Sequence, residues 1–275
     1  MDEILLQATA GLYLLAIGAF VLYLVFPREL LSRAGQTVLF LGFLSHTFEL
    51  TLLFYETGYP AFAQTRETLS FYGWLMVGLY LLVQVKYRLP ILGCFIAPLA
   101  FLTSLGSIAA GGGGQELPPA LLTYWLPLHV IMALLGNAVF GLAFAVSLIY
   151  LLLRHQLKSK KMSMNGLSRG VPALETLDRL NKIFLVWGFA LMTLGILTGS
   201  LWARIHWGTY WSWDARQITS GMTCLWYGIL LHGRLTAGWR GRKAALWTIV
   251  GFAVVLGYFL WGDLLFPTRH GGRFD

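Results

Sequence analysis

The chain is 275 residues long, 57% of them hydrophobic and only 12% charged, and its formal net charge at pH 7 is +8. A soluble domain carries about 25% charged residues, so this composition argues against a soluble globular protein. The positive charge does not by itself indicate a nucleic-acid partner, because the cytoplasmic loops of membrane proteins are rich in Lys and Arg. We therefore expect an integral membrane protein whose surroundings are a lipid bilayer, with no nucleic acid bound.

Apolar stretches of about 20 residues recur along the whole sequence, which is the length an α-helix needs to cross about 30 Å of hydrocarbon. We predict an all-α polytopic bundle of about eight transmembrane helices, forming one integral-membrane domain over residues 1–275. The predicted spans are residues 4–26, 37–56, 68–86, 89–108, 124–153, 183–203, 217–235 and 245–265. The N-terminal segment lacks the basic start and cleavage site of a secretory signal, so we interpret it as a retained span.

The connections between the spans predict the orientation of the chain. Short connectors at 27–36 and 86–90 join the first four spans, the Gly- and Pro-rich segment 111–122 is predicted to be a loop, and 154–182 is the longest polar linker. With both termini outside the cytoplasm, most basic residues face the cytoplasm, as the positive-inside rule requires. The outer side then keeps five of the twenty, Arg66, Arg204, Arg216, Arg269 and Arg273.

The cysteine pattern excludes some chemistry. The two cysteines, Cys94 and Cys224, lie far apart within predicted spans, and the sequence contains no CxxC or CxxCH motif. Thiol redox chemistry and covalent attachment of haem to this chain are therefore not expected. The sequence also lacks the GxSxG, HExxH and Walker motifs of common enzyme classes.

Two histidines are predicted at the same membrane face. His129 lies about one turn inside the outer end of the fifth span, and His270 follows the outer end of the eighth span. Ionisable groups at membrane depth are costly and tend to mark functional sites. Two facing imidazoles can supply the axial nitrogen ligands of a haem iron.

The segment IHWGTYWSWDARQITS, residues 205–220, lies between these histidines in the chain and carries four aromatic rings in seven positions. The rings belong to Trp207, Tyr210, Trp211 and Trp213, and Asp214 and Arg216 follow. Such rings can stack on a porphyrin, and nearby arginines can pair with its propionates. Trp and Tyr also gather at membrane interfaces, so an aromatic belt with Asp214 paired to Arg216 remains an alternative to a haem platform.

The remaining histidines have separate interpretations. His232 lies near the inner end of the seventh span, about 30 Å from the outer face, so as a ligand it would serve a second site. His46 lies mid-span with Glu49 one turn on, which favours a hydrogen-bonded structural pair. His206 either lines the aromatic loop or is exposed there, and His155 is interpreted as a solvated residue of the polar linker.

The segment WGTYWSWD, residues 207–214, matches the tryptophan-rich WGxxWxWD signature (the WWD domain) of the cytochrome c assembly family, which includes CcsA/ResC and CcmC. Five further segments resemble the family, namely SHTFEL…TGYPAFAQTRETLSFYGW (45–74), LPLHVIMALLGNAVFGLAF (126–144), GILTGSLWARIHWGTYWSWD (195–214, the approach to the signature), YGILLHGR (227–234) and RHGG (269–272). The resemblance extends over nearly the whole chain, and eight spans suit CcsA/ResC better than the shorter CcmC. One departure is WDARQIT (213–219), which is closer to the CcmC pattern.

The resemblance implies a role for each matching residue. His129 and His270 would be the axial ligands of an external haem b. The surface between them would be formed by Trp207, Trp211, Trp213 and Asp214. His232 would match the transmembrane histidine of a transit site whose second ligand comes from a CcsB/ResB-like partner subunit.

The implied activity is export and presentation of haem b, kept reduced, for covalent attachment to CxxCH apocytochromes c. It would take place at the extracytoplasmic face of a bacterial cytoplasmic membrane or a thylakoid-type membrane. Any catalysis would consist of positioning haem within a synthetase that includes the partner subunit. Two alternatives stay open: a HemX-like haem-binding regulator without synthetase activity, and a transporter of another flat hydrophobic solute.

Overall fold

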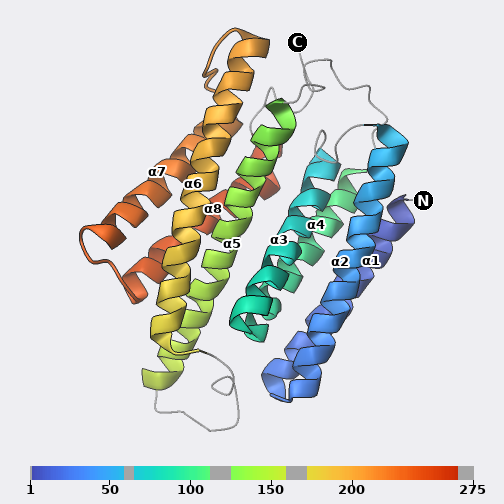
Figure 1. Cartoon of the computed structure of the whole chain (residues 1–275), viewed down its shortest axis with the longest axis vertical. Helices are drawn as coiled ribbons and strands as arrows, with labels where there is room; N and C mark the ends of the chain where they lie inside the picture. Colours follow the sequence, from blue (N-terminus) through green and yellow to red (C-terminus); the bar gives the residue numbers. More distant parts are fainter. Residues whose placement is uncertain (1, 59–64, 112–124, 159–171, 266–275) are drawn as a thin grey trace. The chain divides into compact units, whose positions relative to one another are not determined.

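The computed structural model describes residues 2–58, 65–111, 125–158 and 172–265, with side chains placed as far as residue 257. Within these ranges the chain is helical and contains no strand (Figure 1). The helices are α1 (Asp2–Val25), α2 (Glu29–Thr57), α3 (Thr65–Tyr87), the short 3₁₀ helix η1 (Pro90–Leu92), α4 (Gly93–Ala110), α5 (Trp125–Lys158), α6 (Leu174–Trp207), α7 (Ala215–Leu235) and α8 (Arg242–Leu265). The predicted all-α architecture is confirmed.

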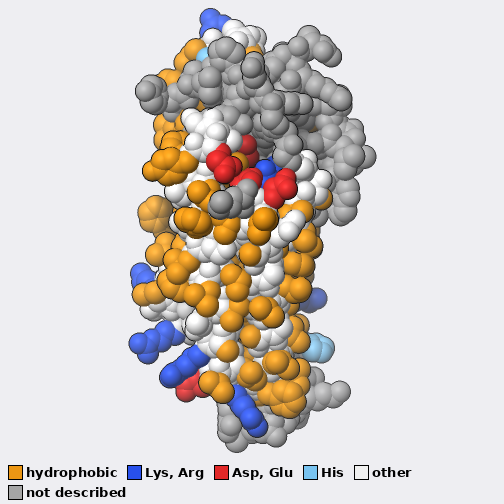
Figure 2. All heavy atoms as spheres, turned by 90° about the vertical axis from the view of Figure 1, so that its right-hand side faces the viewer, with side chains coloured by type: hydrophobic (Ala, Val, Ile, Leu, Met, Phe, Trp, Pro, Cys, Tyr) orange, Lys and Arg blue, Asp and Glu red, His pale blue; other side chains and the backbone are white. Residues whose placement is uncertain are grey.

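Six helical segments in the described part of the chain are long and apolar enough to cross a bilayer: α1, α2, α3, η1 with α4, α5 and α6. A helix pairs its backbone N–H and C=O groups internally, which is necessary because hydrocarbon offers them no hydrogen-bond partner. Figure 2 shows hydrophobic side chains covering much of one face of the molecule, as lipid exposure requires. The chain is therefore an integral membrane bundle. The seventh and eighth predicted spans coincide with α7 and α8, which are not among these six, so their membrane crossing stays a prediction.

Several helices extend beyond the predicted spans. α2 begins at Glu29, so most of the predicted connector 27–36 is helical. α5 continues to Lys158 and α6 begins at Leu174, so both ends of the predicted linker 154–182 are helical. At 34 residues each, these two helices are about 51 Å long, whereas the hydrocarbon core is about 30 Å thick. Apolar patterning marks only the part of a helix that lies in hydrocarbon, which explains the difference.

The chain divides into two compact units. Unit 1 comprises Met1–Gly113 and Leu148–Leu177, and unit 2 comprises Gly114–Ser147 and Asp178–Asp275. In unit 1, α1 packs against α2 and α4, and α3 packs against α4. In unit 2, α7 packs against α8, and parts of α5 and α6 run side by side (Figure 1). That the units act as one domain stays a prediction.

Glycines allow α5 and α6 to approach closely within unit 2. A Cβ atom added at Gly136 would lie 2.8 Å from the backbone nitrogen of Met192, and one added at Gly195 would lie 2.9 Å from that of Ala133. Small residues at such contacts let helix backbones approach in a membrane. The close approach brings the first turns of α5 against the last turns of α6, where the candidate site lies.

Candidate functional site

His129 is anchored through one ring nitrogen. It lies half-buried in the second turn of α5, and its Nδ1 is 2.7 Å from the backbone oxygen of Gly195 on α6. A carbonyl oxygen can only accept, so Nδ1 carries the proton and donates it. The neutral ring therefore has its lone pair on Nε2. A histidine held in this way is prepared to bind a metal ion through Nε2.

The His129 ring also lies directly against the backbone of α6. A Cβ atom on Gly199, one turn beyond Gly195, would collide with three atoms of the ring. Gly195 thus orients the ring through its carbonyl, and Gly199 leaves the space that the ring occupies. Sequence reasoning assigned neither residue to the site, although the GxxxG spacing in GILTG (195–199) is a signal that could have found them.

The connection from α6 to α7 has an unusual backbone. α6 ends at Trp207 and α7 begins at Ala215. Gly208 has a φ of +76°, which glycine adopts without steric cost, and Trp213 has a φ of +56°, which is uncommon for a bulky residue. The Trp213 side chain is 76% exposed. The strained backbone thus holds an indole that is largely exposed.

Two side chains at the start of α7 hold this loop in place. Asp214 is buried and caps the helix, accepting a hydrogen bond of 2.9 Å from the backbone N–H of Arg216. Gln217 Oε1 accepts hydrogen bonds from the backbone N–H and the hydroxyl of Ser212, at 2.7 and 3.0 Å. Asp214 thus satisfies a donor of the first helical turn, which is a structural role. Gln217 was not predicted from the sequence.

Trp207 connects the loop to the turn of α5 that carries His129. Its ring packs edge-on against Trp202, with the ring centroids 5.0 Å apart. Trp202 forms a buried cluster with Leu126, and Val130 packs against the same cluster. Leu126 and Val130 flank His129 along α5. The cluster therefore holds the His129 turn and the start of the aromatic loop at the same end of unit 2.

The other rings of the loop are more accessible. Tyr210 is 57% exposed, and the Arg204 guanidinium lies over its ring, 5.6 Å from the centroid. Arg204 also donates a hydrogen bond to the Gly208 carbonyl. Trp211 and Trp213 pack edge to face, with centroids 6.0 Å apart. The loop thus presents aromatic rings beside a cation in a fixed arrangement.

Two buried polar atoms at this end have no hydrogen-bond partner among the described residues: His206 Nε2 and Trp211 Nε1. The His206 ring packs against Trp202, with centroids 5.0 Å apart. His206 is half-buried and lies in the last turn of α6, just before the loop. Buried polar atoms without partners are costly, so each needs an explanation such as a bound ligand.

His232 lies away from this end of unit 2. His232 is exposed near the far end of α7, about 26 Å beyond Ala215 along the helix axis at 1.5 Å per residue. It cannot share a ligand with the end of α7 that carries the loop. His270 and Arg269 lie outside the described residues.

Comparison with known proteins places these features in a family. A family model described as "Cytochrome C assembly protein" matches residues 62–265, which include α3 to α8 and the aromatic loop. The chain belongs to the cytochrome c assembly protein family. The relationship predicted from WGTYWSWD is therefore confirmed.

Curated relatives extend this comparison. The cytochrome c biogenesis protein CcsA of Pyropia yezoensis is 27% identical, over 93% of this chain and 92% of that protein. CcsA of Guillardia theta is 30% identical over 80% and 78%, and CcsA of Prochlorococcus marinus (strain AS9601) is 30% identical over 83% and 81%. Among solved structures, the cytochrome c heme lyase CcmF matches with a TM-score of 0.67, covering 98% of this chain and 50% of that one. At 16% identity, this match shows a shared fold, and the chain spans half the length of CcmF.

Proposed function

We propose that this member of the cytochrome c assembly family binds haem b as its substrate at the end of unit 2 formed by His129, the end of α6 and the aromatic loop, and presents it to apocytochrome c. The observation that carries the proposal is the bond from His129 Nδ1 to the Gly195 carbonyl. This bond leaves the lone pair on Nε2, the atom that coordinates iron when a second partner orients the ring.

The residues around His129 fit a haem. Exposed rings at Tyr210 and Trp213 offer flat apolar surface to a porphyrin. Arg204 lies beside Tyr210 and offers a guanidinium to a propionate. The buried Nε1 of Trp211 supplies a further donor. The second axial ligand in this proposal is His270.

The chain contributes position and orientation to the reaction. Haem supplies the vinyl groups to which the thiols of a CxxCH apocytochrome add. The loop is held by Gln217 and by the Asp214 cap, and the ligand ring is held by Gly195. Orientation of this kind turns an encounter between two molecules into a reaction at high effective concentration. We place this end of unit 2 on the extracytoplasmic side of a bacterial cytoplasmic membrane or a thylakoid-type membrane, following the distribution of basic residues.

A second haem contact is proposed at His232, with a CcsB/ResB-like subunit as the partner. His232 continues a row of exposed side chains along α7, spaced alternately by four and three residues. The row consists of Ile218, Met222, Leu225 and Ile229. An exposed imidazole in line with an apolar helix face is costly against lipid, and a partner helix or its haem would remove that cost.

The test is the visible spectrum of the detergent-purified protein, oxidised and reduced with dithionite. We expect a reduced haem b spectrum in the wild type, its loss or alteration in His129→Ala and His270→Ala, and partial recovery on addition of imidazole. His155→Ala is the matched control, because His155 is exposed near the other end of the same helix.

The proposal is wrong if the wild type is colourless even when co-expressed with a CcsB-like subunit, or if His129→Ala binds haem as the wild type does. Covalent attachment to a co-expressed apocytochrome distinguishes the two haem-binding alternatives. A HemX-like regulator would bind haem without supporting that attachment.

A further inference from the structure

Unit 1 encloses a line of four hydrogen-bonded side chains from three helices. Tyr13 lies on α1, His46 and Glu49 on α2, and Ser70 on α3. Each is at most 1% exposed. Tyr13 Oη is 3.0 Å from His46 Nδ1, His46 Nε2 is 2.8 Å from Ser70 Oγ, and Ser70 Oγ is 3.2 Å from Glu49 Oε2. The predicted pair His46–Glu49 is not directly hydrogen-bonded, since His46 Nε2 lies 3.9 Å from Glu49 Oε2, and Ser70 bridges the two side chains instead.

The hydrogens along this line point in one direction when the imidazole is neutral. Ser70 donates its single hydroxyl hydrogen to Glu49 Oε2. His46 Nε2 must therefore carry the hydrogen that it shares with Ser70, and a neutral ring has no second N–H. His46 Nδ1 then accepts from the Tyr13 hydroxyl. The three contacts form one continuous line of donors that ends at the Glu49 carboxyl group.

Glu49 itself is only half satisfied. Its Oε1 is buried and has no hydrogen-bond partner among the described residues. An ionised carboxylate in an apolar interior needs several donors or a cation to offset its lost hydration, and here a single hydroxyl donates to it. A proton bound to the carboxyl group would remove this cost.

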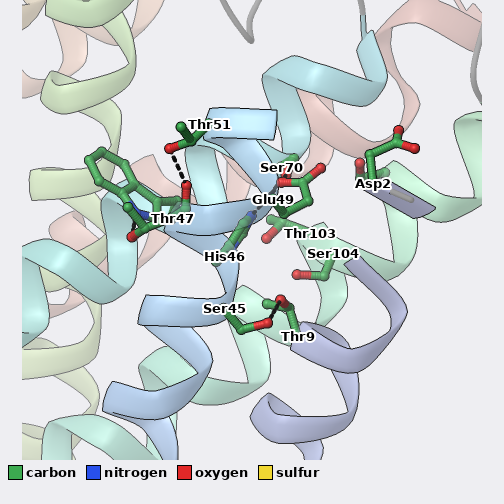
Figure 3. Close-up of polar contacts among 12 residues, drawn as sticks. Asp2, Thr9, Ser45, His46, Thr47, Glu49, Thr51, Ser70, Thr103 and Ser104 are labelled. Atoms are coloured by element: carbon green, nitrogen blue, oxygen red, sulfur yellow. Dashed lines mark hydrogen bonds and ion pairs between the residues drawn. The ribbon is translucent and has the colours of Figure 1, made fainter. Parts of the chain in front are cut away.

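The charged groups that act on Glu49 are Asp2 on α1, and Arg66 and Glu67 on α3. Arg66 and Asp2 form an ion pair of 2.8 Å, so the Arg66 guanidinium is shared with a carboxylate other than Glu49. α4 faces the region with hydroxyl groups (Thr103 and Ser104 in Figure 3), which donate to the carbonyl of Ala100 in their own helix.

The charged groups of Asp2, Arg66 and Glu67 lie towards the start of α1, and the hydrogen-bonded line runs from Glu49 away from them. Figure 2 shows acidic side chains gathered around a basic one near one end of this face. Tyr13, at the other end of the line, lies about 17 Å along α1 from Asp2 at 1.5 Å per residue. Along the line from the Asp2 end, Glu49 therefore comes before the imidazole and the phenol.

We propose that Glu49 is a proton-binding site of unit 1, hydrogen-bonded through Ser70 to His46 and Tyr13. A hydronium ion transfers its proton to the Glu49 carboxylate, which forms an O–H bond and leaves a water molecule. The step converts a buried negative charge between α1, α2 and α3 into a neutral group. The proposal is independent of haem binding, so either can fail alone.

The test is infrared difference spectroscopy of the whole protein in lipid nanodiscs, taken between acid and neutral pH in H₂O and in D₂O. We expect a C=O band of a protonated carboxyl group that moves to lower frequency in D₂O and is absent in Glu49→Gln. The matched control is Glu56→Gln, which removes an exposed carboxyl group from the same helix and should keep the band. Absence of the band in the wild type, or its persistence in Glu49→Gln, overturns the proposal.

Ser70→Ala tests the line without removing a charged group, and it decides the question if Glu49→Gln does not fold by circular dichroism. The variant removes the hydroxyl that donates to Glu49, so the C=O band should move to higher frequency. An unchanged frequency in Ser70→Ala would show that the carboxyl group being titrated is not hydrogen-bonded to this line, which also overturns the proposal.

Discussion

His46 in unit 1 and His129 in unit 2 each lie within an apolar helix, and their surroundings differ in two respects. His46 is completely buried, and both of its ring nitrogens have side-chain partners, Tyr13 and Ser70. His129 is half-buried and is held by a backbone carbonyl at Nδ1. The first arrangement encloses an imidazole within a polar line, and the second orients one at the end of unit 2 that carries the exposed aromatic rings. The two sites are distinguished by whether the imidazole is enclosed by side chains or partly exposed, and not by depth in the membrane.

The family model matches residues 62–265, which include His129, the aromatic loop and Ser70 but not Tyr13, His46 or Glu49. If the comparison is correct, enclosed polar groups should mainly determine stability, and the displayed groups should mainly determine ligand binding.

The largest expected effect is on stability and concerns a polar group enclosed in unit 2. Arg234 is buried and donates to Asn181 Oδ1 at 2.8 Å and to Asp178 Oδ2 at 3.0 Å. Arg234→Met leaves these acceptors without the guanidinium, and we expect the free energy of unfolding to fall by about 3–5 kcal/mol. Denaturant titration in detergent, followed by circular dichroism, measures it.

The control for this prediction is Arg33→Met, which removes the exposed ion pair of Arg33 with Glu29 and should cost at most about 1 kcal/mol. The spectrum of haem held at His129 should be retained in folded Arg234→Met, since Arg234 lies near the far end of α7 from the loop. Equal losses of stability in the two variants would contradict the distinction between enclosed and exposed pairs.

The second effect is on ligand affinity. Gly199→Ala places a methyl group where the His129 ring lies, so the ring must move from its position beside Gly195. Disturbing the support of a metal ligand costs about 10–100-fold in affinity, and we expect that loss in a haem titration. The control is Gly257→Ala, since a Cβ atom there has no neighbour within 4 Å. If the two variants bind haem with equal affinity, α6 does not orient the His129 ring for haem binding.

The smallest expected effect is on stability, and it distinguishes the helix-capping role of the Asp214 side chain from the role of its negative charge. Asp214→Ala removes the acceptor for the Arg216 N–H and should lower the free energy of unfolding by about 1 kcal/mol. Asp214→Asn keeps an oxygen that can cap the helix, so its stability should stay close to that of the wild type. If Asn proves as destabilising as Ala in the same titration, the negative charge matters more than the cap.

The sequence by itself determined the membrane class, the helical spans and the aromatic loop. Hydrocarbon of about 30 Å imposes apolar stretches of nearly constant length, and the family signature WGTYWSWD is contiguous in the chain. Both are local properties that can be read without knowing which helices touch. The polar ends of α5 and α6 are different, because those residues carry no apolar pattern.

The tertiary structure alone decided which atoms meet. The tautomer of His129 depends on a carbonyl from α6, and the space for its ring depends on Gly199, 70 positions further along the chain. The Glu49 line draws one residue each from α1 and α3 and two from α2. Contacts between helices depend on how the helices pack and rotate against one another, and hydropathy does not encode that geometry. For this reason both histidines could be selected from the sequence, but only the fold shows that His46 is enclosed and that His129 is partly exposed.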